Sequence, residues 1–180
     1  MGGIICSYGG YHVFFTYLRP FLEHDLALRP DTLSAVLLAF GVANCLGTFA
    51  AGFVLNRWFR RTLPAVFLAF VAVAILFLIG GGVRLNLALA LIWGFLFGFI
   101  PVGWSAWIAR TLADKAEVAG GLSVAVTQFS MGLVAAVGGV TFDHVGITGN
   151  FAIAALFLIV AFILARASFS LYARATGRLA

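Results

Sequence analysis

The sequence predicts an all-α integral membrane protein whose six transmembrane helices form two inverted three-helix repeats. Its composition carries the first part of this prediction, because 63% of its 180 residues are hydrophobic and only 9% are charged. Soluble domains average about 45–50% apolar and about 25% charged residues, so a soluble enzyme is excluded. A disordered chain is excluded too, since disorder requires low hydrophobicity and high net charge. A helical crossing needs roughly 20 apolar residues, which gives room for about six crossings.

Six apolar segments are separated by short connections rich in Gly, Pro and charged residues. Pro30 is a start signal for the second helix, and the run Gly80-Gly81-Gly82 closes the third. Pro101 lies inside the fourth segment and is expected to bend it, because proline lacks a backbone N–H. We therefore expect residues 1–180 to form one six-helix bundle without a second, soluble domain. The predicted helices are 3–22, 32–55, 63–79, 85–109, 118–142 and 151–165.

The basic residues predict the orientation of the bundle, since Lys and Arg collect in the cytoplasmic loops of membrane proteins. Eight of the eleven lie in the second-to-third connection, the fourth-to-fifth connection or the C-terminal tail: Arg57, Arg60, Arg61, Arg110, Lys115, Arg166, Arg174 and Arg178. Arg19, Arg29 and Arg84 lie in the alternate connections. We expect the C-terminus to be cytoplasmic. The net charge of +5 is then explained by the basic residues of the cytoplasmic loops, and no nucleic-acid partner is expected.

Polar residues sort the six segments into two kinds. The third and sixth carry nothing more polar than Ala or Gly between their ends, and such helices can face lipid. The other four carry polar or aromatic side chains at helical spacing, and the fifth is expected at the centre of the bundle. The lipid-facing helix is thus the last of each triplet. Because each repeat has three helices, the two triplets enter the membrane from opposite sides, as in known transporters with inverted repeats.

The clearest pathway candidate is His12, near mid-depth of the first segment. It lies within about 80° of Tyr8, Thr16 and Arg19 on a helical wheel. An ionisable residue inside a membrane is a functional hypothesis by default, although a hydrogen bond to a neighbouring helix would also explain it. Arg19 is near the outer end, where it can snorkel to the interface.

Two amides and several small residues complete the pattern. Asn44 and Gln128 lie near mid-depth and need partners, either on a neighbouring helix or on a substrate. The small residues Ser34, Gly41, Cys45, Thr48 and Gly52 are expected to pack against another helix. The motif Gly94-x-x-x-Gly98 is also interpreted as a packing contact. Along the fourth segment, Trp93, Phe97, Pro101 and Trp104 form an aromatic face that would suit a flat substrate.

No enzyme chemistry stands out. The sequence has no phosphate-binding loop and no Cys/His cluster with metal spacing, so no metal or cofactor is expected. The sequence Gly103-Trp104-Ser105 resembles the G-x-S motif of rhomboid-type intramembrane serine proteases. Such an enzyme needs a base beside the serine. His144 lies at the opposite end of the bundle, and His12 would meet Ser105 only by an accident of packing.

Taken together, the motifs resemble the C-terminal six-helix half of a major facilitator superfamily transporter. The most specific of them is the run 100–110, Ile-Pro-Val-Gly-Trp-Ser-Ala-Trp-Ile-Ala-Arg, which continues to Glu117. It is similar to the bacterial purine ribonucleoside efflux pumps of the drug/proton-antiporter branch. Residues 14–20, the end of the fifth segment around Gly138 and Asp143, and the second copy of the cytoplasmic loop motif agree. That loop motif consists of Gly52, Asn56, Arg57, Arg60 and Arg61.

The resemblance implies proton-driven export of purine ribonucleosides by alternating access in a bacterial inner membrane. It also implies a central cavity lined by the first, second, fourth and fifth segments. The expected pathway residues are His12, Thr16, Asn44, Trp104, Ser105 and Gln128. No carboxylate lies inside a predicted span, so either His12 carries the coupled proton or the essential acid is on another polypeptide.

The sequence departs from the family pattern in two respects. Asn56 stands where the loop motif usually has Asp, which removes a charge that could latch one state. Six helices that the family places before this bundle are absent, and the usual coupling acid is among them. We expect a lipid bilayer, a small-molecule substrate, and either an N-terminal six-helix half or a second copy as partners. The alternative is a membrane-embedded remnant or interaction protein without transport of its own.

Overall fold

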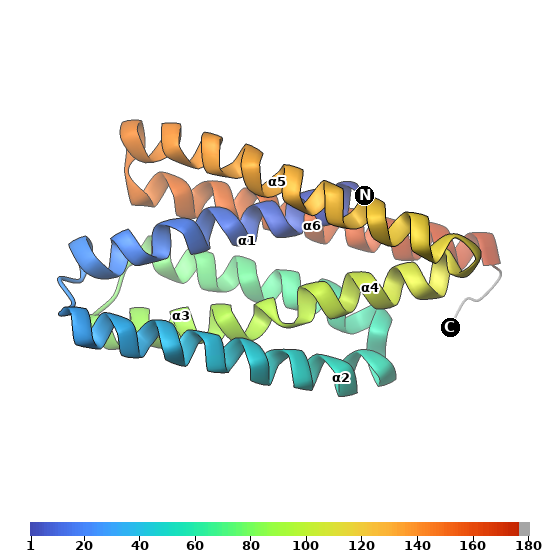
Figure 1. The fold of residues 1–180 in the computed structure, drawn as a ribbon, viewed down its shortest axis with the longest axis horizontal. Coiled ribbons are helices and arrows are strands. Elements are labelled where there is room, and N and C mark those ends of the chain that lie inside the picture. Colours follow the sequence, from blue (N-terminus) through green and yellow to red (C-terminus); the bar gives the residue numbers. More distant parts are fainter. Residues whose placement is uncertain (177–180) are drawn as a thin grey trace.

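The computed structural model describes residues 1–176, and all the secondary structure in that range is helical (Figure 1). Arg178, which belongs to the predicted basic tail, lies outside the described residues. The elements are α1 (Gly2–Pro20), the π-helix η1 (Phe21–Asp25), α2 (Pro30–Ile79), α3 (Val83–Phe97), α4 (Phe99–Thr111), the 3₁₀-helix η2 (Ala113–Lys115), α5 (Ala116–Val145) and α6 (Ile147–Thr176).

α2 contains the second and third predicted segments as two arms joined at Trp58. The predicted loop around residues 56–62 is helical except at Trp58, whose φ of −131° and ψ of 42° break the helix. The hydroxyl of Thr62 donates a hydrogen bond of 2.9 Å to the Trp58 carbonyl oxygen at the break. We call residues 30–57 the first arm and residues 59–79 the second arm. The chain reverses direction between them (Figure 1).

The fourth predicted segment is divided into α3 and α4 at Gly98. Pro101, three residues later, has no N–H to offer the Phe97 carbonyl oxygen, the acceptor it would otherwise use in an α-helix. The interruption therefore lies one turn before the proline, and Pro101 itself lies in the first turn of α4.

Two helix ends depend on glycine backbone conformations. Gly80 after α2 has φ +81°, and Gly146 after α5 has φ +77°. Residues with a Cβ rarely adopt these angles, so glycine at these positions permits the chain to leave the helix.

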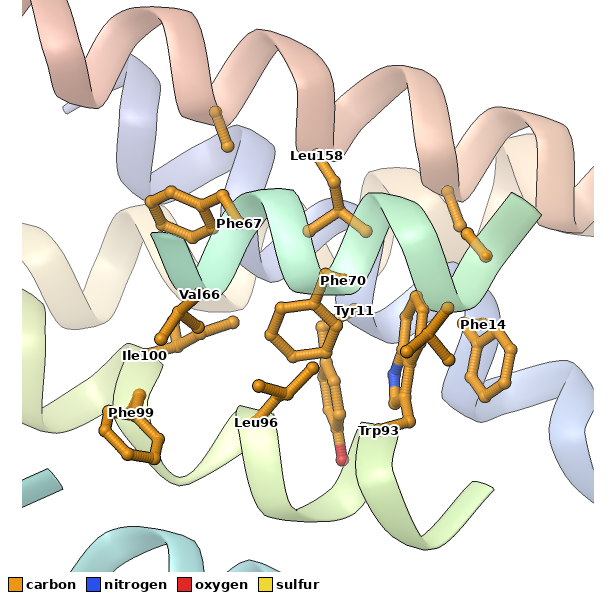
Figure 2. Packing of buried hydrophobic residues seen from close by; sticks show 14 of the residues in the cluster. Tyr11, Phe14, Val66, Phe67, Phe70, Trp93, Leu96, Phe99, Ile100 and Leu158 are labelled. Atoms are coloured by element: carbon orange, nitrogen blue, oxygen red, sulfur yellow. The ribbon is translucent and has the colours of Figure 1, made fainter. Parts of the chain in front are cut away.

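The core is formed by α1, the second arm of α2, α3, α4 and α6. Figure 2 shows the second arm between α6 on one side and α3 and α4 on the other, with Phe70 beside Trp93. The two rings are 4.7 Å apart between centroids and meet edge to face. Trp93 also stacks on Phe14 of α1 at 3.8 Å. The second arm and α6 each bury one face in this core and expose the other, where Leu68 and Leu156 lie.

The prediction that the fifth segment lies at the centre of the bundle is wrong. α5 runs along one edge and the first arm of α2 along another (Figure 1). α5 buries only Ala119, Ser130, Val134 and Gly138. Small or polar residues on two faces suggested two buried sides. In this chain α5 packs mainly against α1 and α6, with a smaller contact to α4, and its other side is exposed.

Four helical stretches are long and apolar enough to cross a membrane among the described residues. They are Pro30–Ile79, Val83–Thr111, Ala113–Val145 and Ile147–Tyr172. α1 is not among them, because its apolar residues are interrupted by tyrosines and by His12. α6 continues to Thr176 and so extends well past the predicted end at residue 165.

Candidate functional site

The polar face predicted for α1 lies on its less buried side. Thr16 and Arg19 are exposed, while Tyr8 and His12 are half-buried. Arg19 Nε lies 3.7 Å from Glu23 Oε2, one turn later. An exposed pair of this kind contributes little to stability.

His12 is surrounded by aromatic rings and has an unsatisfied nitrogen. Its ring lies edge to face with Tyr11 at 5.0 Å and with Phe97 of α3 at 6.2 Å, and stacks on Tyr8 at 6.3 Å. Its Nε2 atom is buried without a hydrogen-bond partner among the described residues. Buried polar atoms are almost always paired, so an orphan nitrogen needs a functional or structural explanation. No described residue offers His12 Nε2 the interhelical hydrogen bond that would explain the residue structurally.

Asn44 lies at the level of this aromatic group, on the first arm of α2. Its backbone carbonyl oxygen contacts Gly98, next to Phe97, at a distance of 2.8 Å from where a Cβ on Gly98 would lie. That carbonyl oxygen accepts a hydrogen bond of 3.0 Å from the hydroxyl of Thr48. The Asn44 side chain is half-buried, so the close packing of α2 on α3 brings it to the same level as His12.

Glycines make this approach possible. A Cβ on Gly47 would coincide with the carbonyl oxygen of Phe95, and one on Gly94 would lie 2.8 Å from the carbonyl oxygen of Phe40. Small residues let helix backbones approach closely inside a bilayer. The interpretation of Gly94-x-x-x-Gly98 as a packing contact is confirmed.

The small residues of the first arm behave differently. Ser34, Gly41, Cys45, Thr48 and Gly52 are all exposed, and nothing lies within 4 Å of a Cβ placed on Gly41 or Gly52. The prediction that they pack against another helix is wrong within this chain. The reason is that the opposite side of the arm, which carries Gly47, meets α3 instead.

Trp104 is part of the packing rather than of an open face. It is only 6% exposed, and its indole N–H donates a hydrogen bond of 2.9 Å to Oγ of Ser7. A Cβ on Gly3 would lie 2.6 Å from the Trp104 ring. Trp93 is fully buried as well, so the aromatic face predicted for the fourth segment is turned mainly into the core.

Ser105 and Gln128 are exposed and lie apart from His12. Ser105 follows Trp104 on α4, nearer the end of the bundle that carries the arginines. On α5, Ser130 donates a hydrogen bond of 2.9 Å to the Ile5 carbonyl oxygen. Successive helical residues turn by about 100°, so Gln128 points nearly away from that contact with α1. Of the predicted pathway residues, Asn44 therefore lies nearest the level of His12, since its carbonyl contacts Gly98 and the Phe97 ring lies 6.2 Å from His12, whereas Gln128 points elsewhere.

The loop motif is at the turn between the two arms of α2. Gly52, Asn56, Arg57, Arg60 and Arg61 are all exposed. The Arg57 guanidinium lies 5.3 Å from the centroid of the Trp58 ring, and Arg110 of α4 lies 4.5 Å from the Phe59 ring. Asn56, Arg57, Arg60, Arg61 and Arg110 help to line an open cavity of about 620 Å³.

Sequence reasoning did not anticipate the residues that organise this region. Ser7 is fully buried, accepts the Trp104 hydrogen bond, and donates its own to the Ile4 carbonyl oxygen at 3.0 Å. Tyr11 stacks on Phe97 with centroids 3.5 Å apart and so forms one wall around His12. The signal was present, because a buried indole N–H needs a partner, but periodicity alone does not identify that partner.

Comparison with known proteins identifies the family. The family model described as Major Facilitator Superfamily matches residues 1–179. The chain belongs to this superfamily of membrane transporters. It is a multi-pass membrane protein and not an enzyme, so the protease hypothesis for Ser105 falls.

Within the superfamily, the chain is similar to curated efflux pumps. The chain is 41% identical over 149 residues to the purine ribonucleoside efflux pump NepI of Escherichia coli strain UTI89. It is 40% identical to the pumps of the same name from Escherichia coli strain K12 and Shigella flexneri. Each alignment covers 82% of this chain but only 38% of the relative. No solved structure matches the chain.

Proposed function

We propose that this chain forms half of a secondary active transporter that exports purine ribonucleosides or similar small molecules. The observation that carries the proposal is the identity of 41% along 82% of the chain with a purine ribonucleoside efflux pump. Transport proceeds by alternating access, and the substrate is held between this bundle and a second one. Six crossings then arise from α1, the two arms of α2, the α3–α4 pair, α5 and α6, as two inverted three-helix repeats. The basic ends and the C-terminus face the cytoplasm.

His12 is the proposed proton-coupling residue. All six acidic residues of the chain are exposed, and they lie in the short helices η1 and η2 or in the end turns of α2 and α5. Proton relays in transporters use Asp, Glu or His. Among the described residues, no acid or base satisfies the Nε2 atom of His12, so a proton or a substrate group can occupy that position.

Polar side chains near His12 suit a nucleoside. The hydroxyl of Thr16 and the amide of Asn44 can bond base edges or ribose hydroxyls, and Tyr8 and Phe97 offer ring surfaces. Ser105 and Gln128 would contact substrate only from other parts of the pathway. Trp104 is buried and hydrogen-bonded to Ser7 of α1, so in this conformation its ring offers no open face for stacking.

A partner surface is expected because this chain alone leaves large side chains uncovered along the first arm of α2 and along α5. Phe49 is 73% and Phe53 is 82% exposed, and Phe129 on α5 is 68% exposed. The partner is either an N-terminal six-helix half or a second copy of the chain. The alternative function, a remnant or interaction protein without transport, predicts no export in any combination.

Export assays in bacteria that lack their own nucleoside efflux pumps test the proposal. The chain is expressed alone and together with an N-terminal six-helix half, and resistance to inosine or guanosine is measured. Export by either combination supports the transporter proposal and identifies the partner. Absence of export in both, with both proteins present in the membrane, contradicts it.

The role of His12 is tested in whichever combination exports. His12→Ala should abolish proton-coupled export while leaving the amount of protein in the membrane unchanged. His24→Ala, at an exposed histidine of η1, is the matched control and should export normally. Unchanged export by the His12 variant would remove it from the mechanism.

A further inference from the structure

A groove with four arginines lies between the second arm of α2 and the C-terminal part of α6. Arg60 and Arg61 line it from α2, and Arg166 and Arg174 from α6. Its volume is about 540 Å³, within the range of sites that hold small ligands. These segments lie toward the same end of the bundle (Figure 1). No acidic side chain is among the described residues that line the groove.

The groove changes from charged to apolar along the helix axes. On α2, Pro64 and Leu68 follow Arg61 by one and two turns into the membrane-spanning arm. On α6, Phe162 precedes Arg166 by one turn in the same direction. The floor is therefore hydrophobic on the side of the bilayer centre and cationic on the side of the interface. This is the polarity of a phospholipid lying parallel to the helices, with its phosphate outward.

Aromatic packing holds the two sides of the groove in place. Phe169 of α6 meets Phe59 of α2 edge to face at 5.5 Å and Trp107 of α4 at 4.6 Å. One turn inward, the Arg166 guanidinium lies 5.8 Å from the centroid of the Phe162 ring. These contacts anchor the extension of α6 past its predicted end. The extension in turn fixes Arg166 and Arg174 beside the groove, which a frayed tail would not do.

We propose that this groove binds an anionic glycerophospholipid. The phosphodiester would bind between Arg61, Arg166 and Arg174, since guanidinium groups pair with phosphate in a bidentate manner. One acyl chain would run along Leu68 and Phe162. Basic pockets between transmembrane helices are suited to acidic lipid headgroups. This inference needs only that the helices span a bilayer, and it does not rest on the proposed transport activity.

Lipid binding to the purified full chain in detergent tests the proposal, with native mass spectrometry as the readout. Dioleoyl phosphatidylglycerol is titrated against dioleoyl phosphatidylcholine, which has the same acyl chains and no net charge. We expect selective binding of phosphatidylglycerol. The double variant Arg61→Gln/Arg166→Gln should lose affinity by about fivefold for each arginine, since a basic residue near an anionic surface contributes about that factor.

A matched control removes the same charge outside the groove. Arg57→Gln/Arg84→Gln replaces one arginine of the same turn and one at the opposite end of the bundle, and it should retain selective binding. Arg61→Lys/Arg166→Lys keeps the charge and serves if the glutamine variant does not fold; it should bind more weakly than the natural chain because it loses the bidentate geometry.

Three outcomes would overturn the proposal. Equal binding of the two lipids would exclude a headgroup site. Equal losses in the groove variants and the Arg57/Arg84 variant would show a general charge effect. Displacement of the lipid by millimolar inorganic phosphate would assign the groove to a free anion instead.

Discussion

The indole N–H of Trp104 donates a 2.9 Å hydrogen bond to Oγ of Ser7, joining α4 to α1 across 97 residues of sequence. Both side chains are buried, and Ser7 passes the interaction on by donating to the Ile4 carbonyl oxygen. Nearby, Ser130 of α5 donates to the Ile5 carbonyl oxygen. Two serine hydrogen bonds therefore hold the beginning of α1 between α4 and α5, about one to two turns before His12.

Loss of the Ser7 hydroxyl should weaken this connection. Ser7→Ala leaves the Trp104 N–H unpaired in the core, so we expect a loss of about 0.6–2 kcal/mol in unfolding free energy. Denaturant unfolding in detergent micelles measures the change. Ser105→Ala, at the exposed residue beside Trp104, is the control and should stay within about 0.5 kcal/mol of the natural chain. Equal effects of the two substitutions would argue against the hydrogen bond as the cause.

The glycines of α2 differ in what surrounds them, which gives a matched pair on one helix. Gly47→Ala forces a methyl group onto the Phe95 carbonyl and should destabilise the bundle by more than about 2 kcal/mol. Gly41→Ala meets open space and should be neutral or stabilising by up to about 1 kcal/mol, since alanine is the better helix former. Thermal unfolding of both variants distinguishes the effect of helix–helix packing from the effect of helix propensity. Similar melting temperatures for the pair would contradict the close contact of α2 with α3.

The turn after α2 makes a second matched pair. Gly80 has φ +81° and ψ 166°, a conformation that is nearly restricted to glycine, while Gly82 has φ −66°. Gly80→Ala should therefore cost about 1–3 kcal/mol, whereas Gly82→Ala should cost far less. A Cβ at either position meets no neighbour within 4 Å, so backbone strain alone separates them. Unfolding free energies measured side by side check this, and a stable Gly80 variant would contradict the turn geometry.

Phe169 should control the end of α6. Its ring is buried against Phe59 and Trp107, so Phe169→Ala is expected to release the last turns of α6 and increase amide hydrogen exchange there. Leu171→Ala removes a side chain that is 65% exposed and should leave exchange unchanged. If exchange in α6 is the same in both variants, the aromatic packing does not anchor the helix.

Much of this protein is encoded locally and was accessible from its residues. Composition predicted a membrane protein, and Pro30 marked the start of α2 and Gly80 the end of its second arm, because hydropathy and backbone preferences act within a few residues. The run from Ile100 to Arg110 and three further motifs predicted the superfamily, because such motifs can be recognised without any tertiary contact. Periodicity also placed Tyr8, His12 and Thr16 on one face of α1.

Tertiary structure decided what each face meets. Trp104 turns into the core to reach Ser7, the small residues of the first arm remain uncovered, and α5 lies at an edge rather than in the centre. The extension of α6 follows from contacts with Phe59 and Trp107, more than 60 residues away. The physical reason is that a helical wheel gives the direction of a side chain from its own axis, whereas burial depends on which helix lies in that direction.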